Sequence, residues 1–449
     1  MAPKLPSASL IQNVRFNALV IVPQAIQGIF RRRRKAVAVA TRAGVDGQAV
    51  GLLAGMKRGH HAGPVWVRVV REPALLLFAV ADIRRALQGS PEPFAPDPES
   101  KRRGMGHFQP DALTISRGEL WENRRRFTEA VLDTGKPLHR RADRFLAACR
   151  EEAAALIEEV EGAGGGTLEW DPFNAAVRRI TRRVILGDSA RDDEEISDLL
   201  ASMMDDANGL PKEVSEHYGP FIERVRGYVE AREEGSLVAL FEQAPQDDRT
   251  KPVGQVPHWL FALGDTLAIN AFRALALLAT HPVQRRRVEE ELAVARAEGP
   301  TDAEAVARLD YLQACLHEAM RLWATTPLLS RETLEETRWN GVAVPAGTQV
   351  LFSNIFNHRD RDAHDFADRF APEAWTNGGD AEDWSFNHFS HGPQGCPGTG
   401  IAVFVGVALL AELLIRRRWR LAGGGTLDPD KPLPNMLDYF GLKFAVEAR

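Results

Sequence analysis

Cysteine is scarce in this chain, and its scarcity argues against two classes of protein. Only three of the 449 residues are cysteines, Cys149, Cys315 and Cys396, an odd number with no close spacing. A disulfide framework and a structural zinc site both need paired or closely spaced cysteines. The pattern favours a reducing compartment, so we expect a cytoplasmic protein.

The chain also lacks an excess of either charge and a long apolar run. The 56 lysines and arginines nearly balance 61 acidic residues, giving a net charge of −5, and nothing indicates a nucleic acid as partner. The apolar stretch 16–30 contains Pro23, Gln24 and Gln27. It is shorter than the ~20 residues of a membrane-spanning helix, so we expect no stable membrane insertion.

Helical periodicity dominates what remains. Strand character is confined to a hairpin at 65–79 and to short stretches at 348–352 and 442–446, while two nearly uniform apolar helices are predicted at 257–280 and 401–415. No repeat or low-complexity linker divides the chain. We therefore predict a mainly α fold with a small β part, in one domain (1–449) whose residues 1–60 form an N-terminal helical lead-in.

The segment before the second apolar helix concentrates glycine, proline and one cysteine. It reads FSHGPQGCPG over residues 389–398. Pro397 is expected to open the following helix, which places Cys396 at the positive helix end, where a thiolate is stabilised. Such a thiolate can bind a soft metal centre, and the glycines let a flat macrocycle approach. Taken alone, the loop is equally compatible with a buried cysteine that binds nothing.

This loop resembles the heme-binding loop of the cytochrome P-450 family, Phe-x-x-Gly-x-Arg-x-Cys-x-Gly. Four positions match, at Phe389, Gly392, Cys396 and Gly398. The resemblance implies that heme b is the cofactor, that Cys396 is its axial ligand, and that Phe389 and Gly392 belong to the cofactor-binding loop. Gln394 replaces the arginine that pairs with a heme propionate, and His391 is a candidate to compensate for it.

Two further motifs imply cations for the heme carboxylates. Trp121 and Arg125 match the family's Trp-x-x-x-Arg helix, and both would donate to the propionates. The alternative is an exposed basic helix face, because Arg124 and Arg126 adjoin them. Arg331 stands where the family often places another propionate-binding arginine, although an arginine on a strand surface is the alternative.

A structural motif completes the resemblance in family order. Glu318 and Arg321 share one helix face, and Arg369 lies in a segment similar to the family's meander. The resemblance implies a buried Glu-Arg-Arg network of these three residues that supports the thiolate loop. Such a network is costly unless every charge is paired, so we assign it to folding and heme retention.

Asp265 and Thr266 interrupt the first apolar helix. A buried acid and hydroxyl cost free energy unless they are paired or used. Thr266 could simply bond a helix carbonyl and Asp265 could act as a cap. The resemblance instead implies that both relay protons while dioxygen is cleaved. Leu263 replaces a usual glycine, so either Leu263 narrows the oxygen pocket or Gly264 supplies the helix distortion.

The implied activity is that of a heme-thiolate monooxygenase. It would insert one oxygen atom from O2 into a small, largely hydrophobic substrate, with electrons from NAD(P)H through a ferredoxin-type donor and its reductase. No reductase is expected to be fused to the chain. By analogy, the substrate would contact residues 90–115, 203–210, 262–263, 326–329 and 437–440. Two alternatives remain open. One is a heme-thiolate peroxygenase, isomerase or dehydratase without external electrons, and the other is a non-catalytic heme- or ligand-binding protein.

Overall fold

Four helices and one π-helical turn precede the first sheet. The computed structural model describes residues 4–162, 166–297, 299, 302–376 and 383–447. The first elements are α1 (Leu10–Phe16), η1 (Asn17–Ile21), α2 (Val22–Gln27), α3 (Arg34–Arg42) and α4 (Val45–Gly59). The amide of Asn17 donates to the carbonyl of Arg68 and accepts from the N–H of Val70. These bonds fix the N-terminal helices against the neighbouring hairpin.

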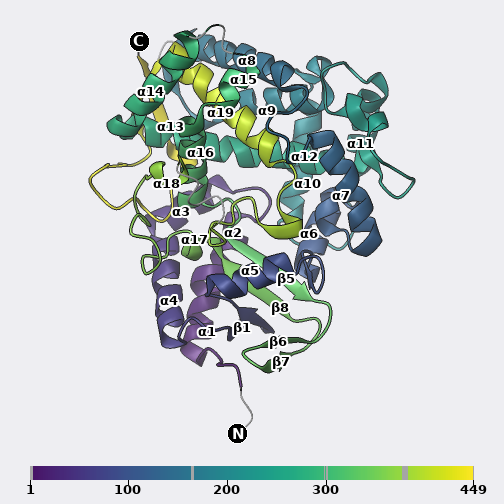
Figure 1. Cartoon of the computed structure of the whole chain (residues 1–449), viewed down its shortest axis with the longest axis vertical. Coiled ribbons are helices and arrows are strands. Elements are labelled where there is room, and N and C mark those ends of the chain that lie inside the picture. Colours follow the sequence, from purple (N-terminus) through teal and green to yellow (C-terminus); the bar gives the residue numbers. More distant parts are fainter. Residues whose placement is uncertain (1–3, 163–165, 298, 300–301, 377–382, 448–449) are drawn as a thin grey trace.

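The main sheet lies at one end of the molecule, beside α1 and α4 (Figure 1). Its strand order is β1-β2-β8-β5-β3, in which only β2 and β8 run parallel. The strands are β1 (Val65–Val69), β2 (Glu72–Leu76), β3 (Phe94–Ala95), β5 (Leu328–Thr333) and β8 (Gln349–Ser353). The hairpin predicted at 65–79 is confirmed. The smaller sheets contain β4 (Thr167–Leu168), β10 (Lys443–Glu447) and β9 (Arg418–Gly423), and β6 (Thr337–Trp339) with β7 (Val342–Val344).

Helices form the rest of the molecule, which confirms the mainly α prediction. Those before the central helix are α5 (Val80–Gln88), α6 (Glu99–Phe108), α7 (Gly118–Leu132), α8 (Ala142–Gly162), α9 (Trp170–Leu186), α10 (Glu194–Ala207) and α11 (Tyr218–Ala231). Those after it are α14 (Pro282–Ala297), α15 (Ala303–Ala307), α16 (Asp310–Leu322), α17 (Asn354–Asn357), α18 (Glu373–Thr376) and α19 (Thr399–Arg416).

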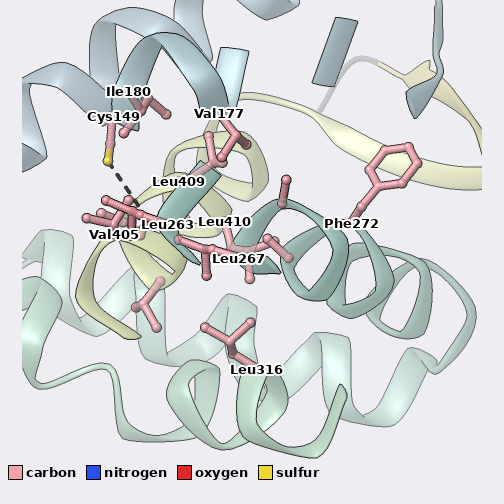
Figure 2. Close-up of a cluster of buried hydrophobic side chains, with 14 of the residues drawn as sticks. Cys149, Val177, Ile180, Leu263, Leu267, Phe272, Leu316, Val405, Leu409 and Leu410 are labelled. Carbon is pink, nitrogen blue, oxygen red and sulfur yellow. Dashed lines mark hydrogen bonds between the residues drawn. The ribbon is translucent and has the colours of Figure 1, made fainter. Parts of the chain in front are cut away.

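The central helix runs through the core in three parts. It comprises α12 (Val256–Phe261), the π-helical turn η6 (Ala262–Thr266) and α13 (Leu267–Thr280). Leu263 and Leu267 pack with side chains of α9, α16 and α19 (Figure 2). The thiol of Cys149 on α8 lies 3.8 Å from the carbonyl of Val405 on α19. Burial of each such aliphatic side chain contributes roughly 1.5–3 kcal/mol, which explains why both apolar helices lie inside.

Two helical segments are long and apolar enough to cross a membrane by length and composition alone. They are Pro252–Thr280 and Thr399–Arg416, and most of each lies buried inside the protein. Core helices of this kind pass the same test as spanning helices.

The ion pair between Glu318 and Arg321 is fully buried on α16. Arg321 donates to both carboxylate oxygens of Glu318, at 2.6 and 2.7 Å, and to the carbonyls of His358 and Ala367 at 2.8 and 3.0 Å. Two buried charges are tolerated because each is surrounded by partners. The pair therefore ties α16 to the segment that follows α17.

The prediction that the side chain of Arg369 is the third member of this network is wrong. Arg369 is exposed, and its guanidinium donates to the carbonyl of Asp365. The indole N–H of Trp375 occupies the expected place, 3.0 Å from Glu318, with the N–H of Ala371 at 2.9 Å. Neutral donors thus complete the shell around Glu318.

Removal of Glu318 should therefore destabilise the fold far more than removal of Arg369. Glu318→Ala leaves Arg321 as a buried, unpaired charge, and we expect it to lower the free energy of unfolding by about 3–5 kcal/mol. Arg369→Ala should change it by no more than about 0.5 kcal/mol. Urea unfolding followed by tryptophan fluorescence measures both, and equal losses would contradict this assignment.

Candidate heme-thiolate site

Backbone hydrogen bonds shape the loop that carries Cys396. The N–H of Cys396 donates to the carbonyl of Phe389 at 2.8 Å, and the N–H of Gly395 donates to the carbonyl of Gly392 at 2.9 Å. α19 begins at Thr399, with Gly398 as its N-cap, so the prediction that Pro397 opens the helix is wrong. Cys396 still lies three residues ahead of the positive helix end.

The environment of the Cys396 thiol contains opposing influences. Its side chain is exposed, although protein surrounds it densely. Desolvation raises the pKa of the Cys396 thiol, whereas hydrogen bonds from the Gly398 N–H and the Thr399 hydroxyl, together with the charge of Arg125, lower it. The same donors would stabilise a thiolate bound to a metal, which removes the desolvation penalty by taking up its charge.

The two residues predicted on α7, Trp121 and Arg125, have different surroundings. Arg125 donates to the carbonyl of Gly395 at 2.7 Å and to the carboxylate of Glu129 at 2.6 Å. The indole N–H of Trp121 is buried and has no hydrogen-bond partner among the described residues. Arg124 is also buried and bonds Ser116, so the alternative of an exposed basic face does not hold for it.

Arg331 is a buried cation on β5. Its guanidinium donates to the Ser90 hydroxyl at 3.0 Å and to the Ser330 carbonyl at 2.9 Å, and lies 3.4 Å from the hydroxyl of Ser390 in the loop. No described carboxylate forms an ion pair with it, and burial lowers its pKa to about 10. The alternative of a strand-surface arginine is therefore wrong, because Arg331 is only 3% exposed.

Lys101 on α6 is a second cation of this region that the sequence did not indicate. It donates to the Thr114 hydroxyl at 2.7 Å and to the Pro96 carbonyl at 3.0 Å. Burial, followed by the charge of Arg331, lowers the pKa of Lys101 to about 7. Arg331 is buried and Lys101 is half-buried, and cations withdrawn from water are costly without a counter-ion. A cofactor with two carboxylates would supply one, so these residues fit heme.

The two other predicted loop residues have internal partners. His391 lies 3.0 Å from the carbonyl of Phe386 through Nε2 and packs against the indole of Trp384. Gly392 has φ +69°, and a Cβ there would lie 2.6 Å from the carbonyl of Leu87 on α5. Close docking of the loop on α5 therefore requires glycine, independently of any cofactor.

Phe389 and Gln394 complete the loop. Phe389 packs against the rings of His317 and His388. Gln394, which replaces the usual arginine, has a buried amide nitrogen with no partner among the described residues. It thus retains one neutral donor for a bound group.

Asp265 and Thr266 lie at the end of the π-helical turn and line a cavity of about 600 Å³. Arg178 on α9, which the sequence did not indicate, donates to Asp265 at 3.2 Å. The carbonyl of Thr266 accepts from the amide of Asn270 at 3.0 Å, and no described bond joins the Thr266 hydroxyl to a helix carbonyl. An acid and a hydroxyl that face one cavity can hold and pass a proton.

Leu263 lies within the π-helical turn. Its side chain lies in the apolar core with Leu267 and Val177 (Figure 2), and it does not line the cavity of Asp265 and Thr266. The hypothesis that Leu263 narrows an oxygen pocket stays a prediction. Gly264 lies within the distorted turn, which agrees with the other alternative.

The cavity is more polar than the predicted substrate segments suggested. Pro327, Tyr439 and Phe440 line it as expected, whereas Phe108 does not and instead packs against Phe30 and Phe261. Arginines and acids from the N-terminal helices and α9 form much of the remaining wall.

Comparison with known proteins agrees with this geometry. The family described as cytochrome P450 matches residues 199–437, more than half of the chain, and the chain belongs to this family. "Cyclooctat-9-en-7-ol 5-monooxygenase" of Streptomyces melanosporofaciens is 26% identical over 71% of this chain and 74% of that protein.

Plant relatives match over shorter stretches. "Cytochrome P450 714C3" of Oryza sativa subsp. japonica is 31% identical over 40% of this chain, and "Tabersonine 6,7-epoxidase isoform 2" of Catharanthus roseus is 33% identical over 36% of it. The chain spans 38% and 32% of the length of these two proteins.

Replacement of the thiol tests its assignment as the metal ligand. Cys396→Ala removes the only sulfur in the loop, so the reduced, carbon monoxide-treated protein should lose the red-shifted band of a thiolate–carbonyl complex. Absorption spectroscopy measures the change. Cys315→Ala, which alters a buried cysteine on α16, is the matched control and should keep the band. An unchanged spectrum of Cys396→Ala would refute the assignment.

Three histidines beneath the loop make the fold sensitive to acid, His358 being buried and His317 and His388 half-buried. His317 Nδ1 lies 3.0 Å from His388 Nε2, and His358 Nε2 accepts from the N–H of Asn387 at 2.8 Å. Burial lowers the pKa of His317 to about 4 and of His358 to about 3, and it lowers the pKa of His388 well below 6.5. All three are therefore neutral in the folded protein at neutral pH.

Stability should consequently fall as the pH drops below 6.5. Above that pH both states carry neutral histidines. Below it the histidines of the unfolded chain bind protons, whereas those of the folded chain stay neutral until the pH reaches their lower pKa. This difference lowers the free energy of unfolding by about 2 kcal/mol per histidine at about pH 5. Unfolding free energies measured across this range should show the slope. His317→Phe should flatten it and the exposed His61→Gln should not, and a slope unaffected by His317→Phe would contradict this account.

Proposed function

We propose that the protein is a heme-thiolate monooxygenase that inserts one oxygen atom from O2 into an organic substrate. The observation that carries this proposal is that Arg125 and Arg331 both reach the Cys396 loop, at Gly395 and Ser390. The buried guanidinium of Arg331, which forms no ion pair with a described carboxylate, and the buried indole N–H of Trp121, which has no described partner, suit a dicarboxylate macrocycle. The heme, when bound, supplies the activation of dioxygen.

The residues of the chain have separable roles in this proposal. Cys396 would ligate the iron, while Trp121, Arg125 and Arg331 would hold the propionates. Thr266 presents its hydroxyl to the cavity and positions a proton there. Asp265, oriented by Arg178, faces the same cavity and supplies that proton.

We further propose that electrons reach the protein from a ferredoxin-type donor, whose reductase uses NAD(P)H. The exposed Arg126 supports this, because it adjoins Arg125 on the helix that contacts the loop. Arg416 and Arg417 pair with Glu412 and Glu161 and so offer less free charge. A cytoplasmic, single-domain enzyme is proposed on the free cysteines and the balanced composition.

Turnover with a surrogate ferredoxin and reductase tests the proposal. With NAD(P)H, labelled dioxygen and a compound that shifts the heme spin state, labelled product should form. Thr266→Ala and Asp265→Asn should each lower product per NAD(P)H consumed by roughly a hundredfold, since both remove part of the proton path. Thr266→Ser retains the hydroxyl and should retain most of the coupling.

The other outcomes discriminate between the alternatives. Turnover driven by peroxide but not by NAD(P)H would replace the proposal with a peroxygenase. No turnover under either condition, with heme and ligand binding intact, would indicate a binding protein.

A further inference from the structure

The cavity beside Asp265 and Thr266 extends away from them toward the N-terminal helices. Its volume is about 600 Å³. Its lining includes the apolar side chains of Phe261, Ile269 and Met436 and the charged side chains of Arg32 and Asp46. The lining thus combines apolar and charged side chains, as expected for an amphipathic ligand.

Arg273 on α13 is a buried cation of this cavity. It donates to the carbonyls of Trp323 and Leu437, at 2.8 and 3.1 Å, but its Nε is buried without a described partner. Its side chain forms no ion pair with any described carboxylate. Burial lowers its pKa to about 10, so it remains charged at neutral pH.

Arg32 is a second cation of this cavity without an ion pair, although it is half-buried rather than buried, and its neighbours show the contrast. Arg31 pairs with Asp205 and Arg34 pairs with Asp171. Arg32 donates only to the neutral amide of Gln24, at 3.1 Å, and no described carboxylate forms an ion pair with it. Burial lowers its pKa.

Asp46 is the acid that faces both of these cations. Its Oδ1 is buried without a partner, and it forms no ion pair among the described residues. The whole lining, with seven arginines and six acids, likewise has one excess positive charge. Arg32, Arg273 and Asp46 together carry one excess positive charge, which a ligand with a single negative charge would neutralise.

Helix α13 sets the distance between the cation Arg273 and the hydroxyl of Thr266, beside which the substrate would be oxidised. Arg273 follows Thr266 by seven residues, which puts both on nearly the same helix face, about 10 Å apart along the axis. A ligand anchored at Arg273 would therefore place an atom several bonds from its charged group beside Thr266.

We propose that the cavity binds a largely hydrophobic substrate with one carboxylate, held by Arg32 and Arg273 and oxidised at a carbon remote from that carboxylate. This inference rests on the proposed function for the oxidation but not for the binding. A planar carboxylate matches a guanidinium in bidentate geometry. A phosphate monoester carries between −1.5 and −2 charges and so exceeds the single excess charge of the cavity.

Calorimetric titration of the heme-loaded, full-length protein tests the binding. The probes are decanoate, 1-decanol and decyl phosphate. We expect decanoate to bind at least about tenfold more tightly than either of the others, because only its charge matches the cavity. Equal affinities for decanoate and 1-decanol, or tighter binding of decyl phosphate, would overturn the proposal.

Three variants locate the charge. Arg32→Gln should remove most of the preference for decanoate over 1-decanol. Asp46→Asn removes a negative charge that repels the carboxylate of decanoate, and it breaks no described hydrogen bond. It should therefore strengthen the preference for decanoate severalfold. Lys35→Gln removes an exposed charge outside the cavity and is the matched control. The proposed site would be contradicted if Lys35→Gln lost the preference for decanoate over 1-decanol. It would also be contradicted if Arg32→Gln kept that preference.

Product analysis separates this inference from the proposed function. Selective decanoate binding without NAD(P)H-dependent product would sink the monooxygenase proposal and leave the carboxylate site standing. Turnover of neutral compounds with no selectivity for carboxylates would support the monooxygenase proposal and contradict the carboxylate site. Oxidation of decanoate beside its carboxylate would contradict the proposed orientation.

Discussion

The guanidinium of Arg321 is the interaction on which the site's geometry depends. It forms an ion pair with Glu318 and also donates to the carbonyl of His358 at 2.8 Å. His358 in turn accepts from the N–H of Asn387, whose carbonyl receives the N–H of Ser390 in the Cys396 loop. A buried charge must keep its partners, so this chain of bonds transmits the rigidity of α16 to the loop.

The placement of positive charge separates structural from functional arginines. Arg31 and Arg34 have acidic partners, and they fasten the N-terminal helices to α10 and α9. Arg273 and Arg331 are buried and Arg32 is half-buried, and none of the three forms an ion pair with a described residue. A folded chain tolerates such groups at a cost in stability, and the cost is offset when a ligand supplies the opposite charge. Two anionic groups, one on a cofactor and one on a substrate, would account for the three.

Local sequence patterns predicted the helices, the strands and the Cys396 loop. They did not predict the hydrogen-bond and charge partners that distant segments of the chain contribute. The apolar helices and the hairpin at residue 65 follow from periodicity. The prediction for Arg369 was wrong because the partner of Glu318 depends on the path of the meander. That path brings Trp375, not Arg369, to the carboxylate of Glu318. Arg178 and Lys101 carry no local signal, since only the folded chain places them beside Asp265 and Arg331.

The π-helical turn Ala262–Thr266 explains how one helix serves two environments. Each turn of this kind holds about one residue more than an α-turn, and one residue corresponds to roughly 100° of rotation about the axis. Leu263 can therefore enter the core while Thr266 faces the cavity. Loss of a single codon in this stretch would regularise the helix and swing the hydroxyl out of register with the pocket. The length of the segment is thus under a constraint as strict as that on the identity of its residues.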